Sequence, residues 1–377
     1  MDIGFQKTIV FLFFIFIGVL LKTKFKSKEE ITGIKKIILN LALPATIFIA
    51  LLGIQIELNL LLLPILALSL NLFLFLVFPL VLPFLGIQKD TPEFRTARLL
   101  APSLAPGLSC FPFVLEFLGE DYLAKAAMAD LGNKVFVLIF LYLVAMNWYL
   151  SLHDRKQKKG LSKVGAMLKV MVSEPVNLFI AAALVLIALG LNMKSLPFVF
   201  SETLQKLSLI MTPLVLLFIG LAVKIKRTQF IQIFSLLSLR AGLVFLISGV
   251  FVVITGIQAT NEILLLLAFG LSACSFWPYA HISAVDSLEV DTKTKKRTFH
   301  NSYAISILAL SFPLSTLLIL GVLNSGLLFT TTSNIFLAAI ALSIIGMLSP
   351  IFSWSKKMIK GHKRVNSRLD SAQAEHI

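Results

Sequence analysis

The feature that most constrains this chain is a succession of apolar runs, each close to the length of a membrane span. A membrane-spanning helix needs about 20 predominantly apolar residues. Hydrophobic residues make up 58% of the 377 positions, charged residues only 14%, and the mean hydropathy is +0.92. Because a soluble domain of this composition would expose large apolar areas, the sequence predicts an all-α, multi-pass integral membrane protein. Eleven candidate spans are found, at about 5–22, 33–54, 58–86, 93–118, 121–150, 173–192, 200–224, 229–256, 261–287, 298–323 and 330–354.

Basic residues are concentrated in alternate connections between these spans. Lys35 and Lys36 belong to the cluster that follows the first span, and Arg155 and Lys156 follow the fifth. Such clusters mark cytoplasmic connections, which predicts an N-out, C-in orientation. The same rule accounts for the net charge of +15 without a nucleic-acid partner. The expected location is the plasma (cytoplasmic or inner) membrane, with another cellular membrane as the alternative.

The longest polar interval between spans, at 153–169, divides the chain into two halves. Two successive five-span units must insert with opposite orientation, which is an inverted repeat. LPATIFIALLG in the second span aligns with TPLVLLFIGLA in the seventh, with Pro44 on Pro213 as hinge or kink positions. Chance similarity between leucine-rich helices is the alternative. The predicted units are a first repeat at 1–152, a cytoplasmic linker at 153–172, a second repeat at 173–323, an additional transmembrane helix at 324–355 and a basic cytoplasmic tail at 356–377.

Two predicted spans, the fourth and the ninth, carry residues that interrupt a helix. Segment 99–113 reads LLAPSLAPGLSCFPF, and segment 267–283 reads LAFGLSACSFWPYAHIS. Proline removes a backbone donor, and in lipid the freed carbonyls need partners in the protein or in a water-lined cavity. Interrupted spans in corresponding places of two halves indicate a transport site near the bilayer midplane. We therefore expect these two helices to be discontinuous and to cross, with simple kinks in packed helices as the alternative.

The chemistry expected at this crossover is carried largely by the backbone. A half-helix that begins after a break presents amide N–H groups, and the half that ends before it presents carbonyls. His281 titrates near neutral pH and is a candidate for anion or proton binding, with hydrogen-bonded packing as the alternative. Cys110 and Cys274 are expected to act as small apolar residues, with a redox-sensitive link as the alternative. The predicted substrate- or ion-binding residues are Pro106, Gly107, Leu108, Ser109, Cys110, Ser275, Phe276, Trp277, Pro278 and His281.

Charged residues inside predicted spans are candidates for ion coupling or charge balance. Asp130 and Lys134 are four residues apart on one helical face, so we expect them to pair. The pair is a candidate for gating, for proton coupling or for charge neutralisation alone. Asn133 is expected to line the cavity. Arg240 either extends toward the inner membrane surface or faces the cavity as an anion clamp.

The stretch at 174–225 carries the most specific pattern of the chain. Pro213, Leu214, Leu216, Ile219 and Gly220 match a P-L-x-L-x-x-I-G run. With the broken spans and the repeat, this pattern resembles the auxin efflux carrier family, which includes plant auxin exporters and bacterial malate permease-like proteins. The resemblance covers residues 5–323. The chain departs from the family's N-x-G-x-x-G-x-P at Ala105 and Cys110, and from its P-x-x-N at His281.

The resemblance implies two inverted five-helix units, a scaffold and a crossover unit that move relative to one another, and organic-anion substrates. The expected function is a secondary permease for small organic anions by alternating access, coupled to a proton or sodium gradient or to the membrane potential. The alternatives are a bile-acid-symporter-like or antiporter-like carrier, and a receptor or regulatory protein that keeps the fold without flux. No enzymatic activity, cofactor or metal site is expected, because the sequence has no Walker-type loop and no HExxH. The lipid bilayer and a second copy of the chain are the other expected partners.

Overall fold

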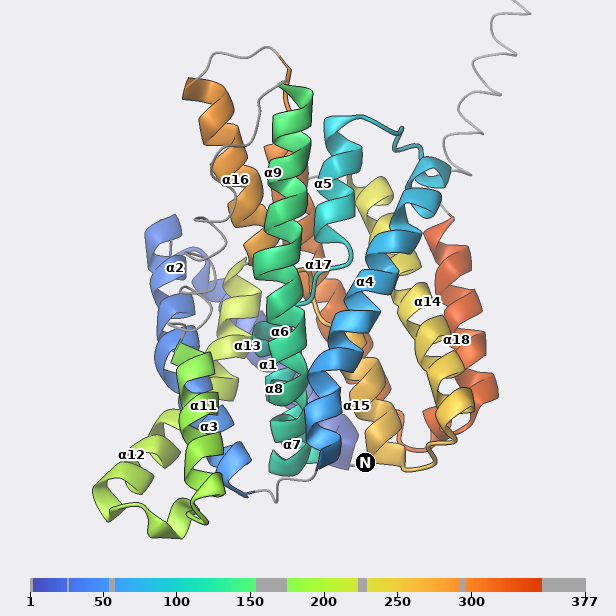
Figure 1. Ribbon diagram of the computed structural model, residues 1–377. Coiled ribbons are helices and arrows are strands. Elements are labelled where there is room, and N and C mark those ends of the chain that lie inside the picture. The colour runs from blue at the N-terminus through green and yellow to red at the C-terminus, as the bar shows by residue number, and fades with distance from the viewer. Residues whose placement is uncertain are drawn as a thin grey trace, which may run out of the picture.

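The computed structural model describes residues 3–25, 27–53, 58–153, 175–222, 229–291 and 296–347. These residues form helices joined by short turns, and no strand occurs among them. The predicted linker beyond residue 153, the last residues of the additional helix and the basic tail at 356–377 lie outside the described residues. Over the part described, the chain is all-α, as predicted (Figure 1).

The first half of the chain forms helices of very different lengths. They are α1 (Ile3–Leu21), α2 (Lys28–Ile37), α3 (Leu43–Gly53), α4 (Leu63–Val81), α5 (Pro92–Leu100), α6 (Pro106–Ser109), α7 (Phe111–Leu118), α8 (Glu120–Lys134) and α9 (Leu141–Leu152). The π-helical segments η1 (Ile38–Ala42) and η4 (Val135–Phe140) join α2 to α3 and α8 to α9, and the 3-10 turns η2 (Leu58–Leu62) and η3 (Leu82–Leu85) flank α4. Pro44 is the second residue of α3, two positions after the end of η1, so it lies beside an irregular turn of an otherwise continuous helix.

The second half contains α11 (Pro175–Ala188), α12 (Phe198–Leu209), α13 (Met211–Ala222), α14 (Phe230–Thr255), α15 (Thr260–Gly270), α16 (Phe276–Asp291), α17 (Asn301–Leu323) and α18 (Thr332–Gly346). Two 3-10 turns, η5 (Met193–Ser195) and η7 (Leu328–Thr330), precede α12 and α18. Pro213 is the third residue of α13. It is tolerated there because the first turn of a helix has no internal partner for its N–H groups.

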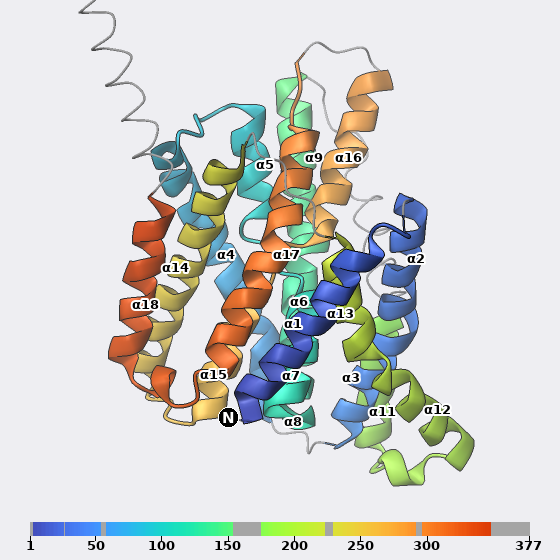
Figure 2. The ribbon, with the colours of Figure 1, turned by 180° about the vertical axis from the view of Figure 1, so that it is seen from behind.

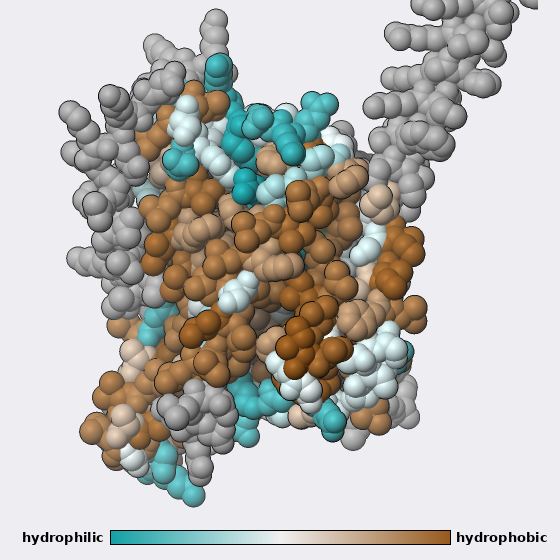
Figure 3. All heavy atoms as spheres, turned by 45° about the vertical axis from the view of Figure 1, so that its right-hand side comes forward, coloured by the Kyte–Doolittle hydropathy of each residue, from teal (hydrophilic) through white to brown (hydrophobic). Residues whose placement is uncertain are grey.

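Among the described residues, six helices are long and apolar enough to cross a membrane. They are Glu29–Gly53, Leu60–Leu85, Glu120–Leu152, Phe198–Leu221, Phe230–Thr255 and Asn301–Leu323. Shorter apolar helices occur at Gln6–Leu21, Pro175–Ala188, Thr260–Gly270 and Thr332–Gly346. Figure 3 shows an apolar band between two ends that carry polar residues. These features are those of a multi-pass membrane protein, while the count of eleven spans stays a prediction.

The helices pack as two groups. In the first, the support group, α1 packs on α13 and α3 packs on α11, with α2 and α12 beside them. In the second, the crossing group, α4 packs on α8, α14 on α18, α5 on α17 and α16 on α9, with α6, α7 and α15 between them. Figures 1 and 2 show the support group on one side of the molecule and the pair α14 and α18 at the other.

Helices α1 and α13 approach backbone to backbone. A Cβ atom added to Gly220 would lie 2.8 Å from the Cα of Gly18 and 2.8 Å from the amide N of Val19. Such close contact needs residues without side chains, as is common where membrane helices associate. The two glycines therefore explain how a helix from the start of the chain is held against one from its second half.

Candidate functional site

Both predicted interruptions are present, and local sequence explains each of them. Helix α5 ends at Leu100 and α6 begins at Pro106, while α15 ends at Gly270 and α16 begins at Phe276. Pro102 cannot continue the hydrogen bonding of α5, and Pro106 occupies the first position of α6, where its missing N–H is not needed. Pro278 is the third residue of α16 and fits its first turn in the same way. We call residues 101–105 the first break and residues 271–275 the second break.

The two breaks touch each other through the backbone. The amide of Ala105 donates to the carbonyl oxygen of Ala273 at 2.8 Å. Two serines of the fourth predicted span add further links: Ser109 Oγ accepts from the amide of Ala273 at 2.9 Å, and Ser103 Oγ accepts from the amide of Ser275 at 3.0 Å. Backbone groups that a continuous helix would have paired internally are thus paired across the crossing, as a span in hydrocarbon requires.

Arg240 of α14 binds the carbonyl groups of both breaks. Its Nε donates to the oxygen of Ala101 at 2.7 Å, and its Nη2 donates to the oxygens of Ser103 at 3.2 Å and Ser272 at 2.8 Å. The side chain is buried, with 3% of the residue exposed. Both expected positions are therefore wrong: Arg240 neither extends to the membrane surface nor lines the central cavity. It stabilises the crossing itself, because one guanidinium carries several donors in a rigid fork.

Asn133 of α8 also holds the first break. Its Nδ2 donates to the carbonyl oxygen of Leu104 at 3.0 Å, and its Oδ1 accepts from the amide of Leu104 at 3.3 Å. Asn71 of α4 donates to the same Oδ1 at 2.9 Å. Sequence reasoning overlooked Asn71, although a single amide side chain in the apolar run of α4 was a usable signal.

Asp130 and Lys134 form the expected ion pair. Lys134 Nζ lies 3.7 Å from Asp130 Oδ2 and donates to Asn177 Oδ1 of α11 at 2.7 Å. Asp130 Oδ1 also accepts from Asn133 Nδ2 at 2.8 Å. The pair therefore connects the network at the first break to a helix of the support group.

A cavity of about 330 Å³ lies beside the crossing. Its walls come from α2, η1, α3, the first break, α6, α8, η4, α11, the second break and α16. The lining residues are Lys35, Leu39, Leu43, Leu104, Ala105, Pro106, Gly107, Leu108, Asp130, Asn133, Lys134, Val137, Val176, Ser275, Phe276, Trp277 and Ala280. A Cβ added to Gly107 would lie 2.9 Å from Leu43 Cδ2, so glycine lets α6 approach α3 here. The cavity thus joins both helix groups at the crossing.

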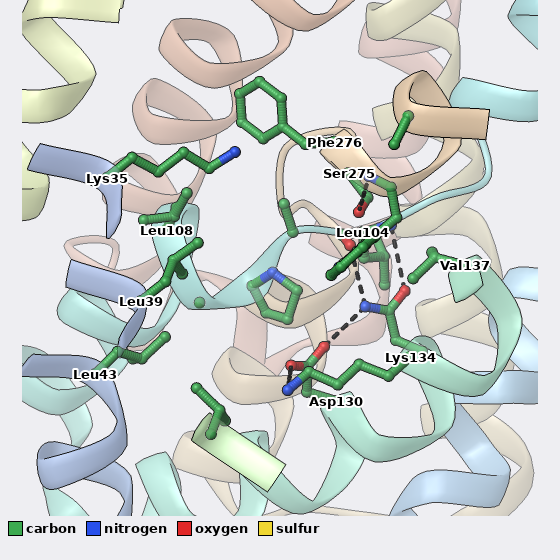
Figure 4. Close-up of a pocket in the computed structure, with 17 residues that line it drawn as sticks. Lys35, Leu39, Leu43, Leu104, Leu108, Asp130, Lys134, Val137, Ser275 and Phe276 are labelled. Carbon is green, nitrogen blue, oxygen red and sulfur yellow. Dashed lines mark hydrogen bonds and ion pairs between the residues drawn. The ribbon is translucent and has the colours of Figure 1, made fainter. Parts of the chain in front are cut away.

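Lys35 is the lining residue that sequence reasoning placed elsewhere. It was counted with the cytoplasmic connection, whereas the structure puts it on α2, which begins earlier with a capping box between Ser27 and Glu30. Its Nζ lies 3.5 Å from the ring centroid of Phe276 (Figure 4). Among the described residues no hydrogen bond or ion pair of Lys35 is found. The cavity therefore contains a lysine whose charge is held by an aromatic face.

Several predicted site residues do not line this cavity. Ser109, Cys110, Pro278 and His281 are absent from its walls. His281 Nε2 lies 2.8 Å from the carbonyl oxygen of Val137 in the π-helical segment η4, and its ring packs against Tyr142. Cys110 and Cys274 are buried free thiols. For His281 the geometry is that of hydrogen-bonded packing, because it provides a partner for a carbonyl in an irregular turn.

Comparison with models of known protein families gives no match, and neither does a search of curated proteins. No group of three or more His, Cys, Asp or Glu side chains that could hold a metal ion occurs among the residues in the described ranges. Over the described ranges, the fold and site are those of an all-helical membrane-type protein with several membrane-length helices and two crossed, discontinuous ones.

Proposed function

We propose that this protein is a secondary active transporter of small organic anions, of the auxin efflux carrier type, that works by alternating access at the crossing. The observation that carries the proposal is the pair of broken helices, hydrogen-bonded break to break, beside a cavity of about 330 Å³. Discontinuous helices that meet at membrane depth are a recurrent way to bind a charged solute without exposing unpaired backbone to lipid. The volume falls in the range of small-molecule sites.

The charges around the cavity favour an anion. Helix α16 is 16 residues long and begins at Phe276 in the cavity wall, so its positive dipole end faces the bound solute. Lys35 adds a full positive charge next to that helix start. Asp130 is already paired with Lys134 and Asn133, which leaves the Lys35 side as the positive pole. Most other walls are apolar, which suits the carbon skeleton of an organic acid.

The packing of the helices supports both the inverted repeat and the moving parts. Helix α1 packs on α13 and α3 packs on α11, and exchange of the two predicted repeats converts one of these pairs into the other. The support group and the crossing group enclose the cavity between them, so displacement of one against the other would change its access. Lys7 of α1 donates to the carbonyl oxygen of Glu116 in α7 at 2.7 Å and links the two groups near the N-terminal end of α1.

Coupling to a proton or sodium gradient would act through Asp130. It is the carboxylate in the cavity wall, and its partners Asn133 and Lys134 connect it to the first break and to α11. A change in its charge would therefore alter contacts in both helix groups. Buried intramembrane carboxylates with such partners are typical of ion-coupled carriers.

The test is transport by purified full-length protein in liposomes. Uptake of labelled mono- and dicarboxylates is measured with and without a pH gradient, a sodium gradient and a membrane potential, against liposomes without protein. We expect saturable flux of at least one organic anion that responds to one gradient. Binding of an anion without flux would contradict the proposal and indicate the receptor alternative, and absence of both would exclude an anion site from the crossing.

A further inference from the structure

A second cavity lies away from the crossing, between α5 and α9. Its volume is about 250 Å³, and it is lined by Asp90, Phe94, Arg95, Arg98, Trp148, Ser151 and Leu152. None of these residues lines the central cavity. Figure 1 shows α5 and the C-terminal part of α9 near the top of the view, the end of the molecule at which α4 also ends. The charge pattern of the sequence assigns this end to the cytoplasmic side.

Arg98 lines this cavity and makes no hydrogen bond with the residues that the structure describes. Its Cζ lies 4.5 Å from the ring centroid of Phe75 and 5.5 Å from that of Trp148. The Nε atom is buried and has no hydrogen bond, and no ion pair of the guanidinium is found with the residues that the structure describes. Two aromatic rings therefore pack against a guanidinium whose buried Nε donor has no acceptor among the described residues. Because a buried donor without an acceptor is unfavourable, this arrangement indicates a ligand that supplies oxygen atoms.

The neighbouring Arg95 differs from Arg98 because its guanidinium forms hydrogen bonds. Its Nε donates to the carbonyl oxygen of Thr298 at 2.8 Å, and its Nη1 donates to that of Asp90 at 3.0 Å. Arg95 thus has a structural role, joining α5 to the turn before α17. Its positive charge still adds to that of Arg98 in the cavity wall, and the Ser151 hydroxyl offers a further donor. The exposed Asp90 is the acidic group in that wall, and its repulsion is opposed by the two arginines.

Helix α4, which provides one of the two rings at Arg98, also exposes apolar side chains. Helix α4 carries Phe75 and exposes Leu76 and Leu80, each 67% exposed, and the following turn exposes Phe84 at 66%. A head group at Arg98 would therefore have its acyl chains alongside these side chains. Guanidinium groups bind phosphate oxygens in a two-pronged geometry, and basic pockets between helices on the cytoplasmic side are suited to anionic lipid head groups.

We propose that this cavity binds a phosphate-type oxyanion, and that its source is the head group of an anionic membrane phospholipid. Arg98 makes the direct contact, with Phe75 and Trp148 packed against its guanidinium. Arg95 and Ser151 form the remaining positive and donor surface. The site is separate from the anion cavity at the crossing, so it does not depend on the proposed transport function.

The experiment measures lipid binding to the detergent-purified full-length protein by native mass spectrometry. Phosphatidylglycerol and phosphatidylcholine with identical acyl chains are titrated, and inorganic phosphate is added as a competitor. We expect the wild-type protein to prefer phosphatidylglycerol by about tenfold or more, and Arg98→Gln to lose this preference. Lys89→Gln is the matched control, because Lys89 is an exposed cation of the same connection that does not line the cavity.

The outcomes test the binding site and also distinguish a lipid head group from free phosphate as its ligand. An unchanged preference in Arg98→Gln would overturn the site. Displacement of the lipid by millimolar inorganic phosphate, with equal binding of the two lipids, would overturn the lipid source and indicate free phosphate. If Arg98→Gln does not fold, Arg98→Lys and Ser151→Ala replace it. The lysine keeps the charge without the two-pronged geometry and must still weaken phosphatidylglycerol binding, or the proposal fails.

Discussion

The two breaks have the same length but lead into very different helices. The first leads into α6, which has 4 residues and is separated from α7 by Cys110. The second leads directly into α16, which has 16 residues. Only a helix of several turns accumulates a useful dipole, so the positive pole of the crossing lies at the second break. The first break instead forms part of the cavity wall and hydrogen-bonds to the second break.

The breaks also differ in what holds them. Asn133 and Arg240, from two other helices, bind the first break at Ala101, Ser103 and Leu104. The second break is held by Ser103 and Ser109 of the fourth predicted span, by Ser311 and by Arg240. The first break is therefore positioned by the helix core, and the second is attached largely to the first.

The largest effect is expected from removal of Arg240, the side chain that binds both breaks. Arg240→Leu leaves three carbonyl oxygens without their donor, and we expect a loss of about 3 kcal/mol or more in stability. Hydrogen exchange should rise at residues 101–105 and 271–275 together, with a lower melting temperature in detergent. Lys206→Gln, which removes an exposed ion pair with Glu202, is the control and should change stability by less than about 1 kcal/mol. A wild-type melting temperature in Arg240→Leu would contradict the assignment.

Two further substitutions should each destabilise one break more than the other. Asn133→Leu removes both hydrogen bonds to Leu104, and we expect a loss of about 2 kcal/mol, with faster exchange at 101–105 than at 271–275. Ser311→Ala removes the acceptor for the amide of Cys274 and should give the opposite pattern with a loss of about 1 kcal/mol. Equal exchange patterns in the two variants would show that the breaks open as one unit.

The positive pole at the second break can be tested by charge removal. Lys35→Gln should weaken binding of the proposed organic-anion substrate by about tenfold, because a charge-assisted contact next to the start of α16 is lost. Lys36→Gln is matched in charge and helix but is exposed and outside the cavity walls. Ligand titration of both variants checks this. Equal affinities would remove Lys35 from the anion site.

The smallest effect is expected at His281, just beyond the second break. His281→Ala removes the partner of the Val137 carbonyl and should lower stability by about 1 kcal/mol. His281→Gln, which can still donate, should restore most of this loss. Flux and its pH profile should match the wild type in both variants. A shifted pH profile would instead assign His281 to the proton pathway.

Local sequence was sufficient to predict those features whose physical cause lies within a few residues of the chain. Proline and small residues predicted both breaks, because a missing donor interrupts a helix regardless of its neighbours. The spacing of Asp130 and Lys134 predicted their ion pair, since residues four apart share a helix face. The resemblance to a transporter family and the count of spans stay predictions.

What the sequence by itself determined is thus an all-helical, membrane-type chain with two interrupted helices and one paired intramembrane charge. The tertiary structure decided which groups satisfy those interruptions. The partners of Arg240 lie 139, 137 and 32 residues away in the chain, and Lys35 meets Phe276 only because α2 packs beside the second break. Periodicity and charge counts describe the helix in which a residue lies. They carry no information about which distant carbonyl or ring the folded chain brings to it.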